Sequence, residues 1–447
     1  MALTGMAVYK SLPKTNCGDC GFPTCMAFAM QVAAKQKAMT DCPHLSDEAK
    51  SEMSEASAPP MKLVRIGPDG DAGFEIGQET VMFRHEEKFH KPTALAIKIP
   101  GSLSDAEAAA KLDAVNDAVF TRVGEELAVG LAAVDLEGLD ADAATARATS
   151  LSEKSRTPLV LMGSDPEALG GAARGTAAKK PLLYKATPAN ADAFVALAAE
   201  TKCPLAVSAD SLEDLADLTN AAKEKGVTDL VLAFDGRNVA ASVRDMTRAR
   251  RAALRKGFRT LGYPAMVDVA VDDPPQENVL AGTFVAKYAS VIILNGSDPA
   301  ELLPELTTIQ NIYTDPQVPN TVEPKLCAIG EVNEDSPVLF TTNFALTYFS
   351  VEAEIERSKV PSFIVVLDTE GLGVLNAYAG DKLVPEDVVK TLEAQGVAEK
   401  VKHRKLIIPG LLPSFRAEIE ETSEWKNVLI GPEMASGLPA FLAENWK

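Results

Sequence analysis

Four of the six cysteines in this 447-residue sequence lie close together near the N-terminus. They are Cys17, Cys20, Cys25 and Cys42, with the spacing C-x2-C-x4-C-x16-C, and a proline follows the last of them. We expect a cytoplasmic protein, in which disulfides are rare, so the clustered thiols indicate metal ligands. Four thiolates are sufficient to hold a [4Fe–4S] cluster, which would pass single electrons to a nearby group.

The loop that joins the first three cysteines contains two glycines, Gly18 and Gly21. Glycine permits the sharp backbone conformations that a loop around one metal centre requires. A zinc site is the alternative, but zinc ligands usually come as two C-x2–4-C pairs. Here the third cysteine lies close to the first pair, which favours iron–sulfur. His44 is expected to be a solvated loop residue rather than a fifth ligand.

Stretches rich in Gly, Ser and Thr follow the predicted strands near the C-terminus. They occupy residues 341–344, 368–373, 409–410 and 431–437. In an α/β sheet, the positions just after the strands present backbone amides and helix N-termini to a ligand. Small residues there leave room for a large flat cofactor, although ordinary strand-to-helix turns remain the alternative.

Several familiar nucleotide and cofactor motifs are absent from the sequence. It has no G-x-G-x-x-G opening a βα unit and no G-x4-G-K-[ST], so NAD-type and P-loop interpretations lack support. It also has no D-x-H-x-x-G, the signature of B12 proteins that ligate cobalt through a histidine, and no histidine in the glycine-rich stretches.

The elements that must position these residues form three predicted domains. Residues 1–58 form a small cluster domain, and residues 59–92 a linker. From 93 to 320, eight short apolar runs alternate with helical stretches, which predicts a (β/α)8 barrel, with an open doubly wound sheet as the alternative. The runs are 94–99, 127–134, 159–162, 182–184, 205–207, 230–234, 266–269 and 291–294.

The remaining residues, 325–447, predict a doubly wound, Rossmann-like α/β domain. Its predicted strands are 338–341, 363–367, 406–408 and 428–430, and its predicted helices are 346–357, 385–394, 415–425 and 438–445. The Pro- and Asp-rich stretch 314–324 indicates a second linker. The chain near residues 58–62 and the stretch 314–324 are expected to act as hinges between domains that move.

The formal net charge of −19 argues against nucleic acids and anionic membranes as partners. No apolar run approaches the roughly 20 residues of a membrane span. Asp235 and Arg237 at a predicted strand end suggest either a catalytic barrel face or part of a scaffold.

At this point the residues resemble a known family. The run C-G-D-C-G-F-P-T-C-M-A-F-A from Cys17, N-I-Y-T-D-P-Q-V-P from Asn311, and the stretches around Thr341, Asp368 and Ile408 are similar to the large (gamma) subunit of the corrinoid iron–sulfur protein. That protein serves the carbon-fixing acetyl-CoA (Wood–Ljungdahl) pathway. The resemblance covers the whole chain and implies the same three domains in the same order.

The resemblance also implies the cofactors and their ligands. It implies a [4Fe–4S] cluster on the four N-terminal cysteines and a cobalamin or related corrinoid held base-off, without a protein histidine on cobalt. No residue is catalytic in its own right, because cobalt is the nucleophile. The corrinoid-binding residues implied are Thr341, Thr342, Asn343, Thr347, Thr369, Glu370, Gly371, Leu372, Gly373, Val374, Asn376, Pro409, Gly410, Leu411, Gly431, Pro432, Ala435, Ser436 and Gly437.

One departure from the family falls inside this set. Many relatives have Ser and Thr where this chain has Gly373 and Asn376. The family's hydroxyl near the upper face of cobalt would fall at Asn376, whose amide can still donate a hydrogen bond.

The function implied is that of a methyl carrier of methyltransferase type. Cob(I)alamin accepts a methyl group from methyl-tetrahydrofolate or a related pterin and delivers it to the nickel site of acetyl-CoA synthase, while the cluster reduces Co(II) back to Co(I). The implied partners are a small subunit in a heterodimer, the methyl-tetrahydrofolate methyltransferase, and acetyl-CoA synthase/CO dehydrogenase. The alternatives are an electron-transfer protein without corrinoid, a barrel pterin methyltransferase that acts alone, and a zinc-containing binding module.

Overall fold

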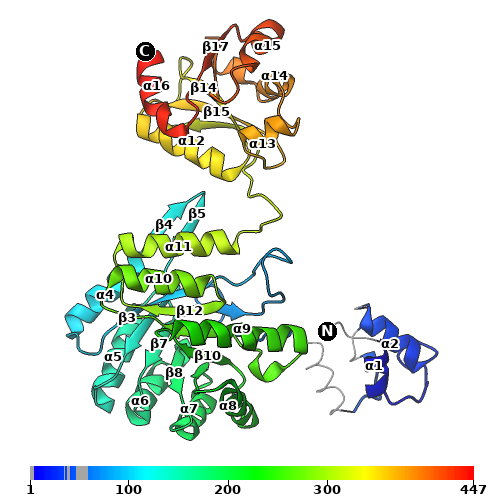
Figure 1. Ribbon diagram of the computed structural model, residues 1–447, viewed down its shortest axis with the longest axis vertical. Coiled ribbons are helices and arrows are strands. Elements are labelled where there is room, and N and C mark those ends of the chain that lie inside the picture. The colour runs from blue at the N-terminus through cyan, green and yellow to red at the C-terminus, as the bar shows by residue number, and fades with distance from the viewer. Residues whose placement is uncertain (1–4, 35, 38–40, 47–58, 447) are drawn as a thin grey trace. The chain divides into compact units, whose positions relative to one another are not determined.

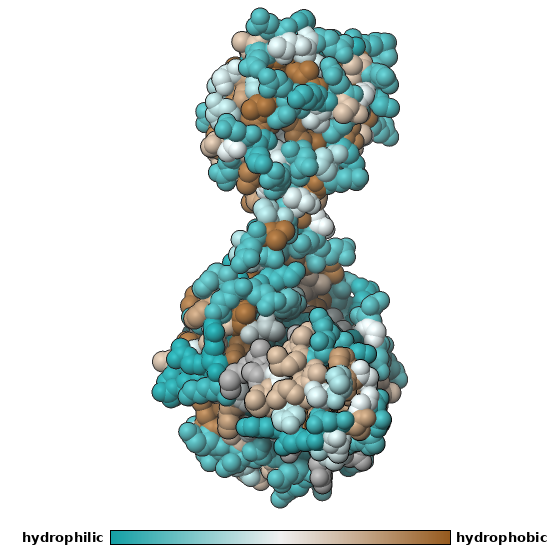
Figure 2. Space-filling model, turned by 90° about the vertical axis from the view of Figure 1, so that its right-hand side faces the viewer, coloured by the Kyte–Doolittle hydropathy of each residue, from teal (hydrophilic) through white to brown (hydrophobic). Residues whose placement is uncertain are grey.

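A computed structural model describes residues 5–34, 36, 37, 41–46 and 59–446. The chain divides into two compact units, Met1–Val119 with Ala128–Tyr313, and Phe120–Leu127 with Thr314–Lys447 (Figure 1). Hydrophilic side chains predominate on the face drawn in Figure 2, in keeping with the net charge of −19. None of the described helices is long and apolar enough to cross a membrane.

The first unit contains a closed barrel of eight parallel strands, as the alternating pattern predicted. The strands follow the order β10-β11-β12-β3-β6-β7-β8-β9 around the barrel, so the prediction of a (β/α)8 barrel is confirmed and the open-sheet alternative is wrong. They are β3 (Ala94–Ile99), β6 (Leu131–Asp135), β7 (Leu159–Met162), β8 (Leu182–Ala186), β9 (Leu205–Val207), β10 (Leu230–Asp235), β11 (Ala265–Asp268) and β12 (Ala289–Leu294).

A helix follows each barrel strand and covers its outer face. These helices are α4 (Asp105–Asp117), α5 (Ala141–Lys154), α6 (Pro166–Thr176), α7 (Ala191–Thr201), α8 (Leu212–Glu224), α9 (Val239–Lys256), α10 (Pro274–Val285) and α11 (Pro299–Tyr313). Many begin at a capping side chain. Ser104 is one example: its Oγ accepts a hydrogen bond from the Glu107 N–H, and the Glu107 carboxylate accepts one from the Ser104 N–H. Side chains from alternate positions of the strands fill the interior, with small residues such as Ala96 and Ala233 letting larger neighbours interdigitate.

The structure contains two hairpins that the apolar pattern did not indicate, and most of the second belongs to the second unit. Strands β1 (Leu63–Ile66) and β2 (Phe74–Gly77) pair antiparallel within the stretch expected to be a linker. Val64, Ile66 and Ile76 from this hairpin join the buried barrel core. Strands β4 (Val119–Arg122) and β5 (Glu125–Ala128) form the second hairpin, so the predicted 127–134 run divides between β5 and β6.

The second unit is built on one five-stranded sheet with the order β13-β15-β14-β16-β17. The strands are β13 (Leu326–Ile329), β14 (Val338–Thr342), β15 (Ser362–Leu367), β16 (Lys405–Ile408) and β17 (Asn427–Ile430). The last four run parallel as predicted, and β13 adds an antiparallel edge strand that the sequence analysis missed. The order reverses at β14, which lies between β15 and β16, so this is the switch point of a doubly wound sheet.

Helices cover both faces of this sheet. Those on one face are α13 (Val374–Ala379), α14 (Pro385–Ala394) and α15 (Phe415–Thr422), around a core that includes Phe340, Val365 and Trp425. On the other face lie α12 (Ala345–Ser358) and α16 (Leu438–Asn445), around Leu339, Ile364 and Ile407. The alternation of Leu339 and Phe340 between the two cores is the period of two expected of a strand buried on both faces.

The N-terminal part contains two short helices, α1 (Gly5–Ser11) and α2 (Cys25–Ala33). Val8, Phe28 and Val32 pack with two of the cysteines into a small core of their own. The predicted end of this domain, near residue 58, lies outside the described residues.

Candidate metal and cofactor sites

The loop that carries Cys17 and Cys20 has the sharp backbone turns predicted for it. Gly18 and Gly21 have φ angles of +83° and +82°, in the left-handed region that favours glycine. The Gly21 N–H donates to the Gly18 carbonyl at 2.9 Å and closes the turn. This turn places the first two cysteines on one tight loop.

The other two cysteines are anchored in the small N-terminal core. Cys25 is the first residue of α2, where the Thr24 hydroxyl caps the helix by accepting the Ala27 N–H at 3.1 Å. Cys25 and Cys42 are buried, and Cys20 packs against the same apolar cluster. None of the four predicted ligands is engaged in a disulfide.

Asn16 and Cys25 form a reciprocal pair that fixes the loop against the helix. The Cys25 N–H donates to Asn16 Oδ1 at 2.8 Å, and the Asn16 N–H points to the Cys25 sulfur at 3.4 Å. Asn16 has a φ of +50°, which asparagine tolerates better than most residues. An N–H group aimed at a ligand sulfur is the kind of contact that tunes a metal centre. The sequence analysis missed this residue.

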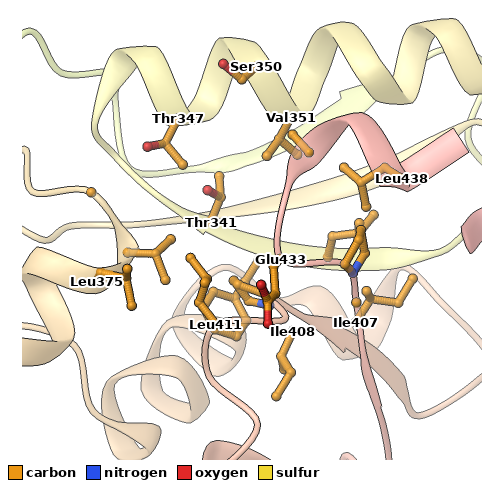
Figure 3. Close-up of a pocket in the computed structure, with 18 of the residues that line it drawn as sticks. Thr341, Thr347, Ser350, Val351, Leu375, Ile407, Ile408, Leu411, Glu433 and Leu438 are labelled. Atoms are coloured by element: carbon orange, nitrogen blue, oxygen red, sulfur yellow. The ribbon is translucent and has the colours of Figure 1, made fainter.

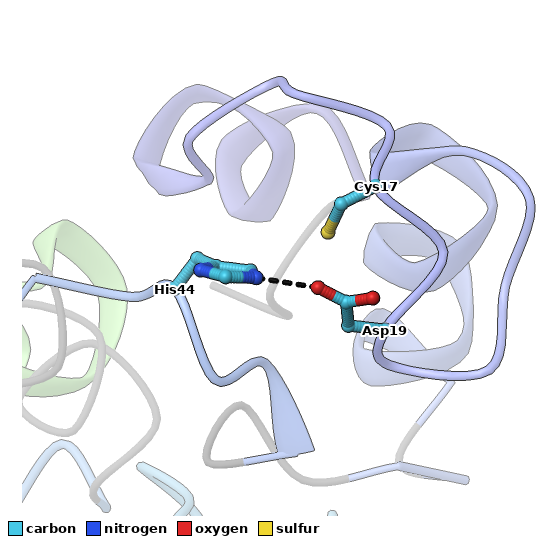
Figure 4. Close-up of side chains that lie close together, drawn as sticks. All are labelled: Cys17, Asp19 and His44. Atoms are coloured by element: carbon cyan, nitrogen blue, oxygen red, sulfur yellow. Dashed lines mark hydrogen bonds and ion pairs between the residues drawn. The ribbon is translucent and has the colours of Figure 1, made fainter.

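Cys17 lies beside an exposed acid–histidine pair (Figure 4). His44 Nε2 and Asp19 Oδ2 are 2.6 Å apart, and the ligand atoms of Cys17, Asp19 and His44 all lie within 4.8 Å of one another. Hydrogen bonds from His44 and then from Cys17 lower the pKa of Asp19. His44 is half exposed and follows Cys42 by two residues, so this contact brings Cys17 close to the segment that carries the fourth cysteine.

The four thiols therefore fit an iron–sulfur centre by their chemistry. They are unbridged, they come from one small folding unit, and a backbone N–H already points at one of the sulfurs. Thiolates are the ligands that such clusters require.

A cavity of about 490 Å³ lies in the second unit, at the switch point of its sheet. It is lined by residues of β14 and β16, including Leu339, Thr341 and Ile408, and by residues of α12. Figure 3 shows Thr347 and Val351 of α12 facing this space. This is the place where doubly wound sheets bind ligands.

About half of the predicted corrinoid-binding residues line this cavity. Thr347, which lies one turn from Ser350, belongs to α12. Gly373 and Asn376 lie at the start of α13. A Cβ atom at Gly373 would lie 3.5 Å from the Phe344 ring, an ordinary contact, so a serine would fit there. The predicted residues that line the cavity are Thr341, Thr347, Gly373, Val374, Asn376, Pro409, Leu411, Gly431, Pro432 and Ala435.

The other predicted residues do not line the cavity, and two of them, Thr369 and Gly371, are hydrogen-bonded to a third, Asn343. Its Oδ1 accepts hydrogen bonds from the backbone N–H groups of Thr369 and Gly371, each at 3.0 Å, and from the Thr369 hydroxyl at 3.1 Å. Its amide nitrogen donates to Asp368 at 3.0 Å. Asn343 is buried, so these bonds fix the turn that leads into α13.

The incoming chain is hydrogen-bonded to the same turn. The Val322 N–H donates to the Asn343 carbonyl, and the Ala345 N–H donates to the Asn320 carbonyl, both at 2.9 Å. A Cβ atom at Gly371, whose φ is +76°, would lie 2.8 Å from the Pro319 side chain. Part of the predicted 314–324 linker is thus packed against the turn.

Close backbone approach explains another of these positions. A Cβ atom at Gly410 would lie 2.5 Å from the Gly431 carbonyl oxygen and 2.6 Å from the Glu433 nitrogen, so only glycine lets the two loops meet. The predicted residues that do not line the cavity are Thr342, Asn343, Thr369, Glu370, Gly371, Leu372, Gly410, Ser436 and Gly437.

Ten lining residues were not predicted, and most are apolar. Leu346 and Val351 lie on the same helix as Thr347, but leucine and valine at helical spacing are indistinguishable in sequence from core residues. Of these residues, only Glu433 could have been singled out from the sequence, because it is a charged residue inside a glycine- and proline-rich stretch. The residues missed are Leu339, Phe340, Leu346, Ser350, Val351, Leu375, Ile407, Ile408, Glu433 and Leu438.

The lining favours a large, mainly apolar ligand. Aliphatic and small residues supply most of it, and hydroxyl, amide and carboxylate groups are few. No histidine lines the cavity: among the described histidines, His403 instead bonds the Ser336 carbonyl at 2.9 Å. The cavity offers shape and hydrogen bonds but no imidazole ligand for a metal.

Comparison with known proteins gives matches over nearly the whole chain. The family described as CO dehydrogenase/acetyl-CoA synthase delta subunit matches residues 63–442, and a putative Fe–S cluster family matches residues 12–44. The corrinoid/iron-sulfur protein large subunit of Moorella thermoacetica is 43% identical over 445 residues, covering 100% of this chain and 99% of the relative.

Archaeal proteins are also similar along their full length. The acetyl-CoA decarbonylase/synthase complex subunit gamma of Methanothermobacter thermautotrophicus is 34% identical, with 99% of each chain covered. The subunit gamma of Methanopyrus kandleri is 36% identical, with 98% of this chain and 97% of the relative covered. A dihydropteroate synthase structure from Yersinia pestis aligns with 49% of this chain and 93% of its own at 12% identity, with a TM-score of 0.36.

Proposed function

Because this chain belongs to the family of corrinoid/iron–sulfur protein large subunits and acetyl-CoA decarbonylase/synthase gamma subunits, we propose that it carries methyl groups on a bound corrinoid. One feature carries this proposal. A single chain combines four unbridged N-terminal cysteines with a mainly apolar cavity at the switch point of its C-terminal sheet.

The N-terminal thiols would hold the iron–sulfur cluster. In this proposal Cys17, Cys20, Cys25 and Cys42 are the ligands of a [4Fe–4S] cluster. Asn16 holds the Cys25 loop in place through its reciprocal bonds. Glycines at the two sharp turns let the loop wrap closely around the cluster.

The cavity in the second unit would hold the corrinoid. Aliphatic side chains such as Val351 and Leu438 supply the contact surface, while Thr341, Thr347 and Asn376 supply hydrogen bonds. No histidine is among the described residues that line the cavity, so no imidazole of this chain would ligate cobalt there; the base-off state is a finer part of the proposal. Asn343 acts from behind by holding the 368–372 turn in shape.

When bound, the corrinoid supplies a metal nucleophile that takes up and releases a methyl group, and the cluster supplies single electrons. The work of the chain is to bind, orient and shield these groups. The finer parts of the proposal are a methyl-tetrahydrofolate or related pterin donor and delivery to the nickel site of acetyl-CoA synthase. A small subunit in a heterodimer, the folate methyltransferase, and acetyl-CoA synthase/CO dehydrogenase are the proposed partners.

Metal analysis of protein purified without oxygen tests the proposal. We expect about one cobalt and about four irons per chain, with corrinoid absorption bands beside the broad iron–sulfur absorption. Iron without cobalt would support the electron-transfer alternative, and zinc in place of iron would support the binding module. Methyl transfer from a pterin to free cobalamin by this chain alone would favour the barrel methyltransferase.

A matched pair of variants tests the cavity itself. Ser350→Trp would place a large ring in the cavity, whereas Ala353→Trp places the same ring on an exposed position of the same helix. We expect the first variant to lose most of its cobalt and keep its iron, and the second to keep both. Equal cobalt content in the two variants would contradict the assignment of this cavity.

A further inference from the structure

The cavity in the second unit has one charged side chain among the described residues that line it. That residue is Glu433, and the described lining includes no lysine, arginine or histidine to balance its carboxylate. Figure 3 shows Glu433 among the residues that line this space, together with aliphatic side chains such as Leu411 and Ile408. A ligand that fills the cavity therefore meets one negative charge on a mainly apolar surface.

The Glu433 carboxylate is available to a ligand. The residue is exposed, and no hydrogen bond or ion pair engages its carboxylate within the described part of the chain. A carboxylate only accepts hydrogen bonds, so it attracts N–H donors and repels another anion. The other polar lining groups, such as the hydroxyls of Thr341 and Thr347 and the amide of Asn376, both donate and accept. Among the described lining residues, Glu433 is thus the one that distinguishes a donor from an anion.

Backbone hydrogen bonds hold the loop that carries Glu433. The Gly431 N–H donates to the Ile408 carbonyl at 2.8 Å and joins the start of the loop to the end of β16. The Gly437 N–H donates to the Met434 carbonyl at 3.0 Å and closes the turn that follows. The point from which the carboxylate projects is therefore set before a ligand arrives, which lowers the cost of recognition.

The corrinoid of the proposed function presents groups that such a charge can tell apart. Amide side chains surround the edge of the corrin ring, and each can be replaced by a carboxyl group of nearly the same shape. The replacement exchanges N–H donors for a negative charge at neutral pH. Apolar contacts discriminate weakly between groups of the same shape, whereas an opposing charge rejects one of them.

Building on the proposed function, we propose that Glu433 is a specificity-determining residue of the cavity. Its carboxylate accepts a hydrogen bond from a peripheral amide of the corrinoid and rejects a corrinoid that carries a carboxylate at that place. The chain thereby selects fully amidated corrinoids over incompletely amidated ones. For the same reason, the phosphate in the nucleotide tail of cobalamin lies away from Glu433.

Monocarboxylic derivatives of cyanocobalamin, each with one amide hydrolysed to the acid, are the probes. The full-length protein with its iron–sulfur cluster, produced without corrinoid, is titrated with cyanocobalamin and with each derivative by calorimetry. We expect at least one derivative to bind the wild-type protein about five- to tenfold more weakly than cyanocobalamin at low salt. Salt at about 1 M should shrink this difference, because it screens exposed charges beyond about 3 Å.

Variants of Glu433 separate its charge from its shape. Glu433→Gln keeps an acceptor oxygen but loses the charge, so it should bind cyanocobalamin and the rejected derivative about equally well. Glu433→Lys should reverse the preference, because its ammonium group attracts the carboxylate of the derivative. Glu444→Gln, at an exposed position of α16 that does not line the cavity, is the matched control and should discriminate like the wild type.

The titrations distinguish failure of this inference from failure of the proposed function. If the wild-type protein bound no cyanocobalamin, the corrinoid assignment itself would be wrong, and the inference would fall with it. If cyanocobalamin bound but every derivative bound equally well, the inference alone would be overturned. It would also be overturned if Glu433→Gln discriminated as strongly as the Glu444→Gln control.

Discussion

Glu305 provides a test of how burial sets charge in the barrel. It lies on α11 with 4% of its surface exposed, and its Oε2 has no hydrogen-bond partner among the described residues. Burial raises the pKa of this carboxyl to about 7, from 4.5 for an unperturbed glutamate. The folded chain therefore holds Glu305 neutral at about pH 5 and charged at about pH 8.

The size of the effect follows from the two pKa values. Their difference corresponds to about 3 kcal/mol of folding free energy. Because the folded pKa is the higher one, this contribution is fully present below pH 4.5 and is lost as the pH rises to about 7. Glu305→Gln removes the titration, so it should be nearly neutral at acid pH and stabilising by up to about 3 kcal/mol at alkaline pH.

Urea unfolding of the full-length protein at about pH 5 and about pH 8 measures this difference, with hydrogen exchange of the α11 amides as a local readout. Glu153→Gln, an exposed glutamate on α5, is the matched control and should show no such pH dependence. If Glu305→Gln changed the free energy of unfolding by the same amount at both pH values, the reasoning would be refuted.

Substitutions at three further residues test other parts of the molecule. Asn343→Ala removes the acceptor of two buried backbone N–H groups and should destabilise the second unit by about 2–6 kcal/mol in denaturant unfolding, with loss of cobalt. Asn16→Ala should weaken the N–H contact to Cys25 and so lower the reduction potential of the cluster, measured in an EPR-monitored titration. Asn16→Gly keeps the positive φ, so its reduction potential should stay closer to that of the wild type. Arg250→Met leaves Glu79 buried without its counter-ion and should cost about 3–5 kcal/mol by thermal unfolding.

The barrel and the parallel sheet could be predicted because their strands are short apolar runs separated by long helical stretches. The hairpin β1–β2 could not, because its strands have four residues each and mix Arg65 and Glu75 into the pattern. These two side chains form a 2.6 Å ion pair across the strands, a pairing that only the folded hairpin makes visible.

The candidate sites were predictable to different degrees. Cysteine spacing alone predicts that the four thiols are metal ligands, since few other roles explain such a cluster in a chain whose cysteines are expected to be reduced. The cavity was predicted through its glycines and hydroxyls, and its aliphatic walls were missed because Leu346 and Val351 follow the same helical period as core residues. Asn343 was predicted to bind the corrinoid, and its hydrogen bonds to the 368–372 turn give it a structural role that the sequence did not indicate.

Hydrogen bonds join Asn320 and Val322 to the junction between β14 and α12, and this attachment has a mechanical consequence. The chain therefore enters the second unit hydrogen-bonded beside the turn that Asn343 holds, and not as a free linker. A displacement of the backbone at Pro319 would therefore meet the turn at Gly371 before it reached the residues that line the cavity.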